Sequence, residues 1–455
     1  MPVQVLSDTE HVKTRPQVYF GCSLEPVVDD AGQVIHSPAF EKLVEEILNN
    51  AADYCAKGIC VWLLPGGTIV VTDDGPGLDG AVLVEGTGQH QVEVAFGRLR
   101  AGRNFQDAQQ RVGQNGLGAK LTNLFSNSFV VETTSQSTTT VCHWEDRMER
   151  LKRSVVRPRK SKDKTGTRIS FKPTYEAFQL TPDHPSILLF LQRRVVEMAC
   201  SLRAHHPQKP TVTFQDQKIT TNTFDKYAHD VLRSETVQCV AKDARWHVCV
   251  FLRPVVEGKR KKKHGDVSFV NHAPTPEGGT HVKMVYDTLF AVLQQRLTTK
   301  KRPVPLKELK EAWGVLVSVS VENPTFNHQG KTKLMTRASE LSPLQVSDHM
   351  VATIAKMMRE RLDDEVAPSS KRRPARHVAK MTHATGKAKN STLIVTEGDS
   401  AKSTAVAAFP LERYGVFPVG GKILNVARAT PKMLSENKEL QDIIHLMQLV
   451  PKRVY

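Results

Sequence analysis

The sequence predicts a mixed α+β protein of more than one domain, and three observations support this class. Strand-like and helix-like segments alternate along the whole chain. A chain of 455 residues is long enough for about two to four domains with ample cores. The composition is that of a globular protein, and no apolar run reaches the ~18 residues of a membrane span. The first 20 residues also lack the apolar core of a secretory signal, so secretion is not expected.

The charge is distributed unevenly along the chain. Residues 1–140 contain 9 Lys and Arg against 16 Asp and Glu, a balance of −7. The remaining residues contain 54 against 31, a balance of +23, within a total net charge of +16. A basic remainder of this size favours a polyanionic partner, of which DNA or RNA is the commonest. The alternative is a solvated basic surface that only maintains solubility.

The cysteines indicate reduced thiols. There are seven, an odd number, and none forms a C-x-x-C pair. This usage is typical of an intracellular compartment rather than of a disulfide framework.

The first element that carries chemistry is a helix expected in SPAFEKLVEEILNNAADYC (37–55). Ser37 suits the N-cap and Pro38 the first helical position. Apolar residues recur at the spacing of one buried helical face, at Phe40, Leu43, Val44, Ile47, Leu48 and Ala51. Glu46 and Asn50 lie one turn apart beside that face. Such a pair can polarise a water and ligate Mg²⁺, although polar residues flanking a buried face are more often only solvated.

The next segment, GICVWLLPGGTIVVTDDGPGLDG (58–80), predicts a β-hairpin. Two β-rich runs flank the turn signal Pro65-Gly66-Gly67, and the second run ends at Asp73. A carboxylate at a strand end can accept a hydrogen bond from an exocyclic amine such as that of adenine. The glycines that follow, among them Gly77, allow the backbone close to a flat ring. Taken alone, the pattern also fits a plain turn.

A glycine-rich loop then opens a further helix in RVGQNGLGAKLTNLF (111–125). Gly113 and Gly118 have the spacing of a P-loop, but Ala119 stands where a P-loop has its lysine. No Ser or Thr directly follows Lys120 to hold Mg²⁺, and the glycines at 113, 116 and 118 do not fit a Rossmann fingerprint. Neither of these two phosphate-loop patterns explains the segment.

E-x-x-x-N on a helix, D-x-G-x-G after a strand and a glycine loop before a helix occur in that order between residues 46 and 120. This combination resembles the Bergerat ATP-binding fold of the GHKL family, an α/β sandwich. The family includes gyrase-like topoisomerases, heat-shock chaperones, histidine kinases and mismatch-repair proteins. The resemblance implies that ATP is bound and that the helix asparagine, Asn50, holds Mg²⁺. The loop backbone and the start of the next helix would cradle the phosphates.

The rest of the chain resembles the eukaryotic and viral type IIA DNA topoisomerases. LSDTEHVKTRPQVYFG (6–21) is similar to their N-terminal strap, and VAFGRLRAGRNF (94–105) to a segment of their ATPase domain. Transducer-like segments are ISFKP, VSFVNHAPTPEGGTHV and VSVENPTFNHQGKTKL; TOPRIM-like segments are LIVTEGDSAKSTAV and YGVFPVGGKILNV. The resemblance implies a GHKL ATPase domain over 1–236 and a ribosomal-protein-S5-like transducer domain over 237–385. A linker and an incomplete TOPRIM domain would occupy 386–455.

The resemblance also implies a set of nucleotide-site residues. Glu46 would be the general base, Asn50 the Mg²⁺ ligand, and Asp73 the adenine-reading carboxylate, with Gly77 beside the ring. Asn104 would also contact nucleotide. The phosphate loop would comprise Gly113, Gln114, Asn115, Gly116, Leu117, Gly118, Ala119 and Lys120.

Two further groups of residues carry over from the later domains. Gln329 and Lys331 occupy a Gln-Thr-Lys position in which Gly330 replaces Thr, and Lys331 would reach the γ-phosphate as a long-reaching point charge. Glu397 would be the first TOPRIM acid, a Mg²⁺ ligand and an acid or base in DNA cleavage. The family's TOPRIM D-x-D and its nucleophilic tyrosine have no counterpart in the sequence, so Tyr455 is not expected to be a nucleophile.

The resemblance thus predicts the ATP-binding and hydrolysing gate of a type II DNA topoisomerase, which controls passage of one duplex through a break in another. Its expected partners are double-stranded DNA, a second protomer in an ATP-dependent homodimer, and a C-terminal cleavage and religation region that is separate or missing, with no membrane. The chain would be a fragment, the product of a truncated gene or one half of a split enzyme. A DNA-associated intracellular location is expected, with the nucleus ahead of mitochondrial, kinetoplast or viral-factory sites. The alternatives are another GHKL clamp of the mismatch-repair type and a catalytically inactive DNA-binding or dimerisation fragment.

Overall fold

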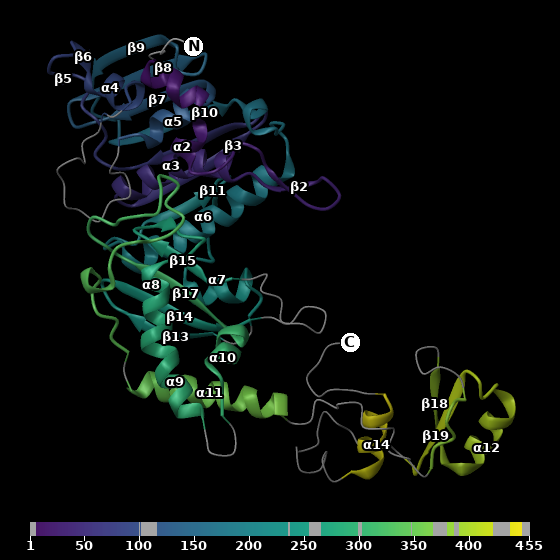
Figure 1. The fold of residues 1–455 in the computed structure, drawn as a ribbon. Coiled ribbons are helices and arrows are strands. Elements are labelled where there is room, and N and C mark those ends of the chain that lie inside the picture. The colour runs from purple at the N-terminus through teal and green to yellow at the C-terminus, as the bar shows by residue number, and fades with distance from the viewer. Residues whose placement is uncertain are drawn as a thin grey trace, which may run out of the picture. The chain divides into compact units, whose positions relative to one another are not determined.

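The structure is a computed structural model that describes residues 6–99, 101, 116–234, 237–253, 265–298, 303–346, 348–366, 380–385, 391–421 and 437–447. Its contacts divide the chain into two compact units, Met1–Glu360 and Arg361–Tyr455. Both units combine helices and strands (Figure 1), so the predicted mixed α+β class is confirmed. Among the described residues, no helix has the length and apolar character needed to cross a membrane.

The first unit begins with two short helices and a small hairpin. The helices are α1 (Asp8–Thr14) and α2 (Pro16–Phe20), and the hairpin is β1 (Val27–Val28) with β2 (Val34–His36). A capping box starts α1, because the Ser7 hydroxyl accepts from the Glu10 N–H while the Glu10 carboxylate accepts from the Ser7 N–H at 2.8 Å. The left-handed Gly21 ends α2.

An eight-stranded sheet forms the centre of this half of the unit (Figure 1). Its strand order is β12-β11-β3-β4-β10-β7-β8-β9, and all neighbours are antiparallel except β11 and β3. The strands are β3 (Gly58–Leu64), β4 (Thr68–Asp73), β7 (Ser126–Thr134), β8 (Thr138–Glu145), β9 (Arg150–Pro158), β10 (Gly166–Pro173), β11 (Thr211–Phe214) and β12 (Gln217–Lys218). β3 and β4 form the predicted hairpin around residues 65–67, which is confirmed.

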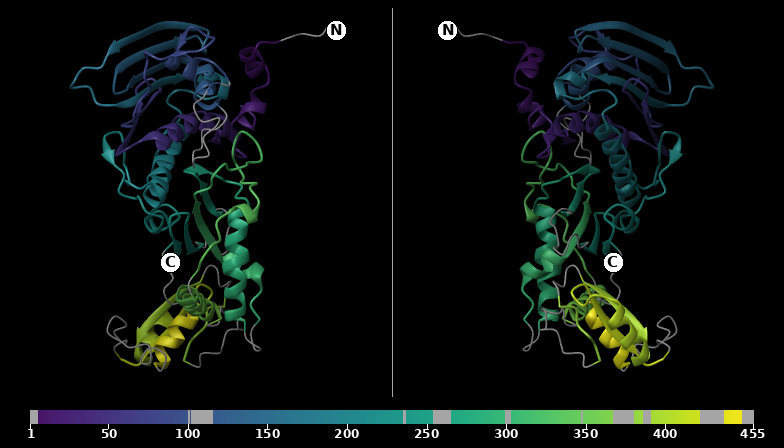
Figure 2. Two further views of the ribbon diagram at one scale, coloured as in Figure 1. Left: turned by 90° about the vertical axis from the view of Figure 1, so that its left-hand side faces the viewer. Right: turned by 90° about the vertical axis from the view of Figure 1, so that its right-hand side faces the viewer.

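Helices pack on this sheet and enclose the largest apolar core (Figure 2). They are α3 (Pro38–Tyr54), α4 (Gln91–Gly97), α5 (Gly118–Leu124) and α6 (Pro185–His205), with a 3-10 turn (Tyr175–Phe178) and the small pair β5 (Leu83–Val84) and β6 (Gln89–His90). The predicted apolar face of α3 is buried in this core. The helix begins at Pro38 as predicted, but the Ser37 side chain makes no capping hydrogen bond and its hydroxyl is buried without a partner.

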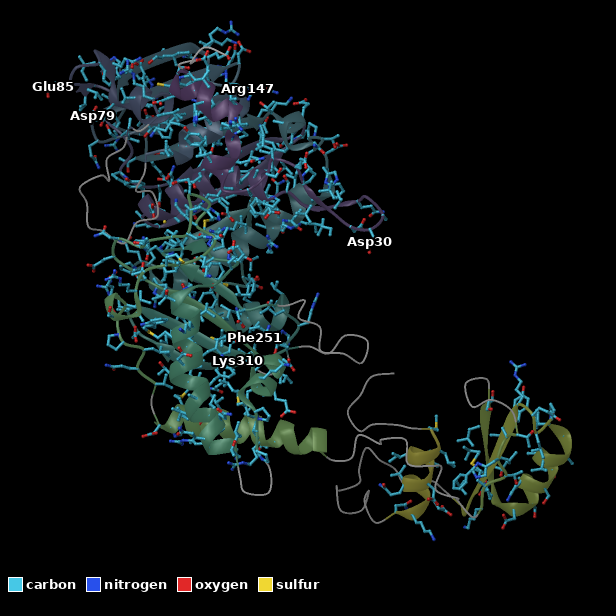
Figure 3. All side chains as sticks on the ribbon, in the orientation of Figure 1. Asp30, Asp79, Glu85, Arg147, Phe251 and Lys310 are labelled. Carbon is cyan, nitrogen blue, oxygen red and sulfur yellow. The ribbon has the colours of Figure 1, made fainter. Side chains whose placement is uncertain are left out.

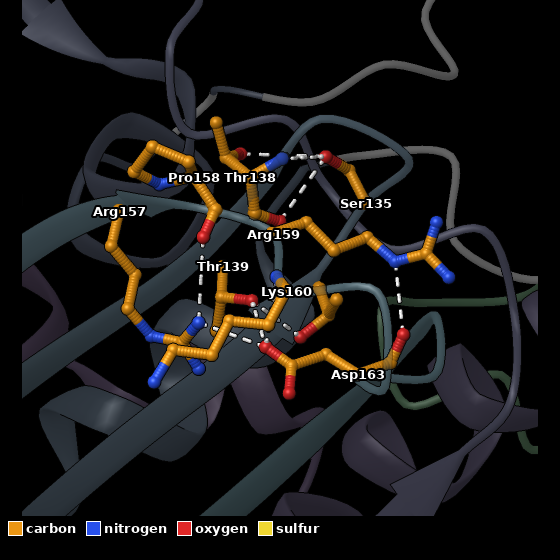
Figure 4. A network of polar contacts seen from close by, with 9 residues as sticks. Ser135, Thr138, Thr139, Arg157, Pro158, Arg159, Lys160 and Asp163 are labelled. Atoms are coloured by element: carbon orange, nitrogen blue, oxygen red, sulfur yellow. Dashed lines mark hydrogen bonds and ion pairs between the residues drawn. The ribbon is translucent and has the colours of Figure 1, made fainter.

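The turn after β9 is fixed by a polar network around Asp163 (Figure 4). The Asp163 carboxylate accepts from the Arg157 guanidinium at 2.8 Å, and the Asp163 carbonyl accepts from Arg159 at 2.9 Å. The sequence predicts an exposed, turn-rich segment over 155–167. Only its middle is a turn, because residues up to Pro158 complete β9 and residues from Gly166 begin β10.

A five-stranded sheet lies at the centre of the other half of the first unit. Its order is β13-β14-β17-β15-β16, with β15 and β17 parallel. The strands are β13 (Val237–Lys242), β14 (Trp246–Leu252), β15 (Val267–Val270), β16 (Ala273–Pro274) and β17 (Trp313–Val319). The accompanying helices are α7 (Phe224–Asp230), α8 (Thr280–Val285), a π-helical turn (Tyr286–Phe290), α9 (Ala291–Leu297), α10 (Leu306–Ala312), a 3-10 turn (Ala338–Glu340) and α11 (Asp348–Val366). The predicted boundary at 236/237 falls between the last strand of one sheet and the first strand of the other.

The second unit contains a short parallel pair of strands. β18 (Thr392–Glu397) and β19 (Tyr414–Val419) are joined through α12 (Gly398–Ala408), and α14 (Lys438–Leu446) follows. Composition alone suggests a linker over 363–391. Residues 363–366 instead complete α11, and Thr382 within the segment forms a bridge with Val416, whereas β18 begins at Thr392, directly after the segment.

Candidate functional site

Residues far apart in the sequence line one cavity in the first unit. It encloses about 1060 Å³, counted to its open mouth. The predicted site residues in its wall are Glu46, Asn50, Asp73, Gly77, Gly116, Leu117, Gly118, Ala119, Lys120, Gln329 and Lys331. Asn104, Gly113, Gln114 and Asn115 lie outside the described residues. The cavity therefore joins α3, the β3–β4 hairpin, the end of the glycine loop and a loop about 285 positions further along the chain.

The carboxylate of Glu46 lies between two lysines in this wall. Glu46 is 3% exposed, and its Oε1 lies 2.7 Å from Lys42 Nζ and 3.6 Å from Lys331 Nζ. Burial acts to raise the pKa of Glu46, but the charges of Lys331 and Lys42 outweigh it and lower the pKa to about 2. Lys331 is itself 6% exposed, and burial lowers its pKa although Glu46 opposes the change. The carboxylate is thus ionised at neutral pH and held by two cations.

Gly118, the first residue of α5, lies in close contact with this carboxylate. A Cβ placed on Gly118 would lie 2.0 Å from Glu46 Oε2. Only glycine therefore allows the loop backbone to pass here without displacing Glu46. Two residues later, the Lys120 ammonium donates to the carbonyl of Ala101, and burial lowers the pKa of Lys120 to about 8.

The tandem asparagines of α3 have separate surroundings. Asn50 lines the cavity. Asn49 is 2% exposed, and its Oδ1 accepts from the Arg194 guanidinium at 3.2 Å. The same guanidinium donates to the His272 carbonyl at 2.8 Å, so Asn49 belongs to the junction between α6 and the second sheet. Asn49 is thus engaged within the protein, whereas Asn50 faces the cavity.

The tandem aspartates after β4 divide in the same way. Asp74 accepts from the N–H groups of Ala56, Lys57 and Gly58 at 2.8 to 3.0 Å, and although burial acts to raise its pKa these bonds lower it. Asp73 lines the cavity and accepts from the Gly75 N–H at 2.9 Å. Burial and the neighbouring Asp74 raise the pKa of Asp73 to about 7, against that one bond. Asp73 is the carboxylate with capacity left for a ligand.

Glycine is required at the end of this turn. Gly77 has φ +67°, and a Cβ there would lie 2.1 Å from the Thr134 carbonyl oxygen. The following Leu78 N–H donates to the Thr133 hydroxyl at 2.9 Å. The turn is therefore held close against the end of β7, at one wall of the cavity. Asp79, which follows, is labelled in Figure 3 and accepts from the Thr138 hydroxyl at 2.8 Å.

The loop that carries Lys331 packs against the N-terminal helices. Lys331 has a left-handed backbone, φ +58°, and its N–H donates to the His328 carbonyl at 2.9 Å. A Cβ on Gly330 would lie 2.8 Å from the Phe20 carbonyl oxygen, and a Cβ on Gly21 would lie 2.1 Å from His328 Nδ1. The replacement of the expected Thr by Gly330 thus permits close contact between this loop and the end of α2.

The sequence interpretation missed the polar residues Lys42, Tyr54 and Thr167 and most of the apolar wall. Lys42 was missed although it lies four residues before Glu46, the spacing that signals a pair on one helical face. Thr167 lines the cavity directly opposite Asp73 in the β10–β4 register, a pairing that only the fold reveals. The apolar wall comprises Ile47, Ala51, Val71, Leu78, Ala95, Phe96 and Ile169.

Glu397 is the one predicted site residue in the second unit. It ends β18, is exposed, and precedes the first residue of α12. Among the described residues, no group of three metal-ligating side chains forms around it. Its predicted part in Mg²⁺ binding stays a prediction.

The cavity has the chemistry of a nucleotide site. The cavity has an apolar wall with Asp73 as an acceptor beside Thr167, which suits a base that carries an exocyclic amine. The wall also contains glycine backbone together with Lys120 and Lys331, which suit phosphates. Glu46 and Asn50 lie one turn apart in the same wall.

Comparisons with known proteins agree with this arrangement. The family model described as DNA gyrase B matches residues 217–381. DNA topoisomerase 2 from Meyerozyma guilliermondii is 30% identical over 522 residues, which cover 99% of this chain and 36% of the relative. Human DNA topoisomerase 2-beta is 30% identical over 510 residues, covering 99% of this chain and 30% of the relative. This chain therefore spans about a third of the length of these curated relatives.

The fold is also similar to a solved structure. The crystal structure of the ATPase region of Saccharomyces cerevisiae topoisomerase II superposes with a TM-score of 0.68 at 26% identity. The match covers 79% of this chain and 98% of the yeast chain. These likenesses, added to the geometry of the cavity, identify the chain as a relative of the type IIA DNA topoisomerases that carries their GHKL ATPase region.

Proposed function

We propose that this chain binds and hydrolyses ATP and acts as the nucleotide-operated gate of a type II DNA topoisomerase. The observation that carries the proposal is the meeting of Glu46, Asn50, Asp73, the glycine loop and Lys331 around one cavity. Lys331 follows β17 of the second sheet, and the other groups lie on or beside elements of the first sheet. A ligand that touches all of them therefore couples the two halves of the first unit. Such coupling is what a gate requires.

The base and the phosphates of ATP have separate partners in this proposal. Asp73 accepts from the exocyclic amine of adenine, and Gly77 leaves room for the ring. Lys120 and the backbone of residues 116–120 bind the phosphates. Asn104 and residues 113–115 extend the same phosphate contacts, as the family resemblance implies.

Magnesium fits the donor set of the phosphate end. Mg²⁺ prefers hard oxygen ligands and keeps several waters, so one amide oxygen from Asn50 together with phosphate oxygens is a suitable set. Bound there, the ion would neutralise charge that develops on the phosphates. Asn49 cannot replace Asn50, because its oxygen is engaged by Arg194.

Hydrolysis in this proposal is controlled by the position of Lys331. While Lys331 lies 3.6 Å from Glu46, the pKa of Glu46 is held near 2, and a carboxylate with so low a pKa is a weak base. When Lys331 turns to the γ-phosphate, Glu46 keeps only Lys42, and its pKa rises. One lysine thus recognises the triphosphate and releases the general base, which then takes a proton from the attacking water.

The whole enzyme's substrate and assembly are proposed on the same basis. Two protomers would close around a DNA duplex when ATP binds, and the strap over residues 6–21 would reach the second protomer. The basic balance of the chain after residue 140 suits a captured duplex. We place the protein on intracellular DNA, with the nucleus as the first location to examine. Two relatives, from Caenorhabditis elegans and Dictyostelium discoideum, are named as mitochondrial, so an organellar location is the alternative.

The test separates binding from hydrolysis. Glu46→Ala should keep its affinity for a non-hydrolysable ATP analogue and lose about 10²–10⁴-fold in the rate of ATP hydrolysis, the usual worth of a general base. Glu45→Gln is the matched control, since Glu45 is the adjacent carboxylate and faces Arg194 at 3.8 Å. Asn50→Ala should instead weaken Mg²⁺-dependent binding. Turnover by Glu46→Ala within tenfold of the unsubstituted chain would show that the base lies elsewhere.

A further inference from the structure

A cluster of metal-ligating side chains lies outside the nucleotide cavity, on the hairpin of β13 and β14 (Figure 1). It consists of Cys239, His247 and Cys249, whose ligand atoms all lie within 4.8 Å of one another. Cys239 and Cys249 are direct partners in the antiparallel register. His247 and Cys249 alternate onto the same face of β14 as Phe251, which is labelled in Figure 3. The three ligands thus converge on one side of one hairpin.

The buried side chain of His247 has polar atoms that no described residue satisfies with a hydrogen bond. Its side chain is 5% exposed, and neither ring nitrogen has a hydrogen-bond partner. The Phe224 ring packs against it, with ring centroids 4.9 Å apart and an interplanar angle of 64°. Buried polar atoms are almost always paired, because an unpaired one has lost its hydrogen bonds to water without a replacement. A ligand that accepts the lone pair of an imidazole nitrogen would supply that replacement.

A fourth donor stands beside the cluster. The Asp225 carboxylate, on α7, lies 3.8 Å from Cys249 Sγ. Asp225 is exposed as a residue, so its side chain is free to adjust toward the cluster. Two sulfurs, one imidazole nitrogen and one carboxylate oxygen make a four-donor set.

We propose that Cys239, His247, Cys249 and Asp225 form a structural zinc site in the second sheet of the first unit. Zn²⁺ binds Cys sulfur, His nitrogen and Asp oxygen, and its structural sites are almost always four-coordinate and tetrahedral. The site lies away from the nucleotide cavity, since none of the four residues lines that cavity. It is a separate property from ATP hydrolysis.

The cluster is open to an ion from one side of the sheet. Cys239 is the half-exposed member of the cluster and lies on β13, the edge strand of the sheet. An ion can therefore reach the site from the sheet edge. Once bound, it would tie the edge hairpin to α7.

A disulfide between Cys239 and Cys249 is the competing interpretation, because the two residues face each other across the strands. A disulfide would leave both nitrogens of His247 unpaired, whereas zinc satisfies one of them. The unpaired histidine therefore favours the metal. The two interpretations also differ in a measurable way, since only the metal depends on His247.

The experiment measures metal content and coordination in the full 455-residue chain. The chain, expressed with Zn²⁺ and purified without chelator, should contain about one zinc per chain by elemental analysis. After exchange, Co²⁺ should give the absorption of a tetrahedral site together with sulfur-to-cobalt charge transfer. Cys239→Ser and His247→Ala should each raise the dissociation constant for Zn²⁺ by more than about 100-fold, beyond the 10–100-fold typical of losing a group that only supports a ligand.

Cys142→Ser is the matched control, because Cys142 is also buried in a strand but belongs to the eight-stranded sheet. It should retain full zinc. Circular dichroism and ATP-analogue binding would show that each variant is folded. Cys239→Ser is the substitution that disturbs packing least, because Cys239 is half-exposed. Substoichiometric zinc in the unsubstituted folded chain, equal zinc in Cys239→Ser, or a Cys239–Cys249 disulfide found by mass spectrometry under native conditions would each overturn the proposal.

Discussion

Replacing Lys331 by alanine tests the proposed γ-phosphate switch directly. The side chain is 6% exposed, and its Nζ lies 3.6 Å from Glu46 Oε1 in the wall of the cavity. A charge-assisted contact between an ammonium and a phosphate oxygen is worth about 1.5–3 kcal/mol. At ~1.4 kcal/mol per tenfold, its loss should weaken triphosphate binding by roughly 10- to 150-fold. ADP lacks the γ-phosphate, so its affinity should change by less than about threefold.

Isothermal titration with a non-hydrolysable ATP analogue and with ADP measures both affinities. Lys333→Ala is the matched control, because Lys333 is an exposed lysine two residues further along the same loop and does not line the cavity. Lys42 remains 2.7 Å from Glu46 in the variant, so the buried carboxylate keeps one cation and the fold should survive. Equal weakening of both ligands by Lys331→Ala, or none, would refute a contact with the γ-phosphate and leave Lys331 as a structural partner of Glu46.

Three further outcomes are expected. Gly118→Ala should slow ATP hydrolysis by at least about 100-fold, because its Cβ would lie 2.0 Å from Glu46 Oε2. Gly265→Ala is the control and should not slow it, because a Cβ there meets nothing within 4 Å. Normal turnover by Gly118→Ala would show that Glu46 tolerates displacement. The pKa of Asp73 is raised from 3.8 to about 7, so the folded chain binds the extra proton between these values and loses stability as pH rises through that window. Asp73→Asn should lack this part of the decline in thermal melts from pH 4 to 8, and parallel curves would contradict the raised pKa. Light scattering should show dimers with a non-hydrolysable ATP analogue and not with ADP. Duplex DNA should bind with a steep salt dependence. An unchanged mass, or DNA binding that is insensitive to salt, would count against the proposed gate.

Periodicity and turn chemistry explain what the sequence predicted well. The apolar spacing in α3 places Glu46 and Asn50 beside a buried face, and Pro65-Gly66-Gly67 separates two β-rich runs. Both signals are local, since they depend on residues within one or two turns of each other. Signals of this kind do not depend on contacts with distant parts of the chain, so both elements appear in the structure where they were predicted.

The rest depends on contacts that local sequence does not encode. The dipeptides Asn49-Asn50 and Asp73-Asp74 do not themselves show which member faces the cavity. That is decided by contacts with other elements, since Arg194 engages Asn49 and the N–H groups of residues 56–58 engage Asp74. Thr167 reaches Asp73 only through the strand order, in which β10 lies next to β4. The extension of α11 to Val366 continues a helix that is already established, where each added residue gains a hydrogen bond, although the polar composition of 363–366 resembles a linker.

The two tandem pairs have a consequence for anyone who maps this site by mutagenesis. An alanine scan scored by activity alone would report Asn49, Asn50, Asp73 and Asp74 as equally essential, because collapse of the scaffold and loss of a ligand both abolish turnover. A melting temperature recorded beside each rate separates the two classes. Asn49 and Asp74 should lower it, since each anchors a distant element, whereas Asn50 and Asp73 should leave it unchanged or raise it. An alignment of homologues that ignores this distinction would assign a binding or catalytic role to residues that only hold the fold together.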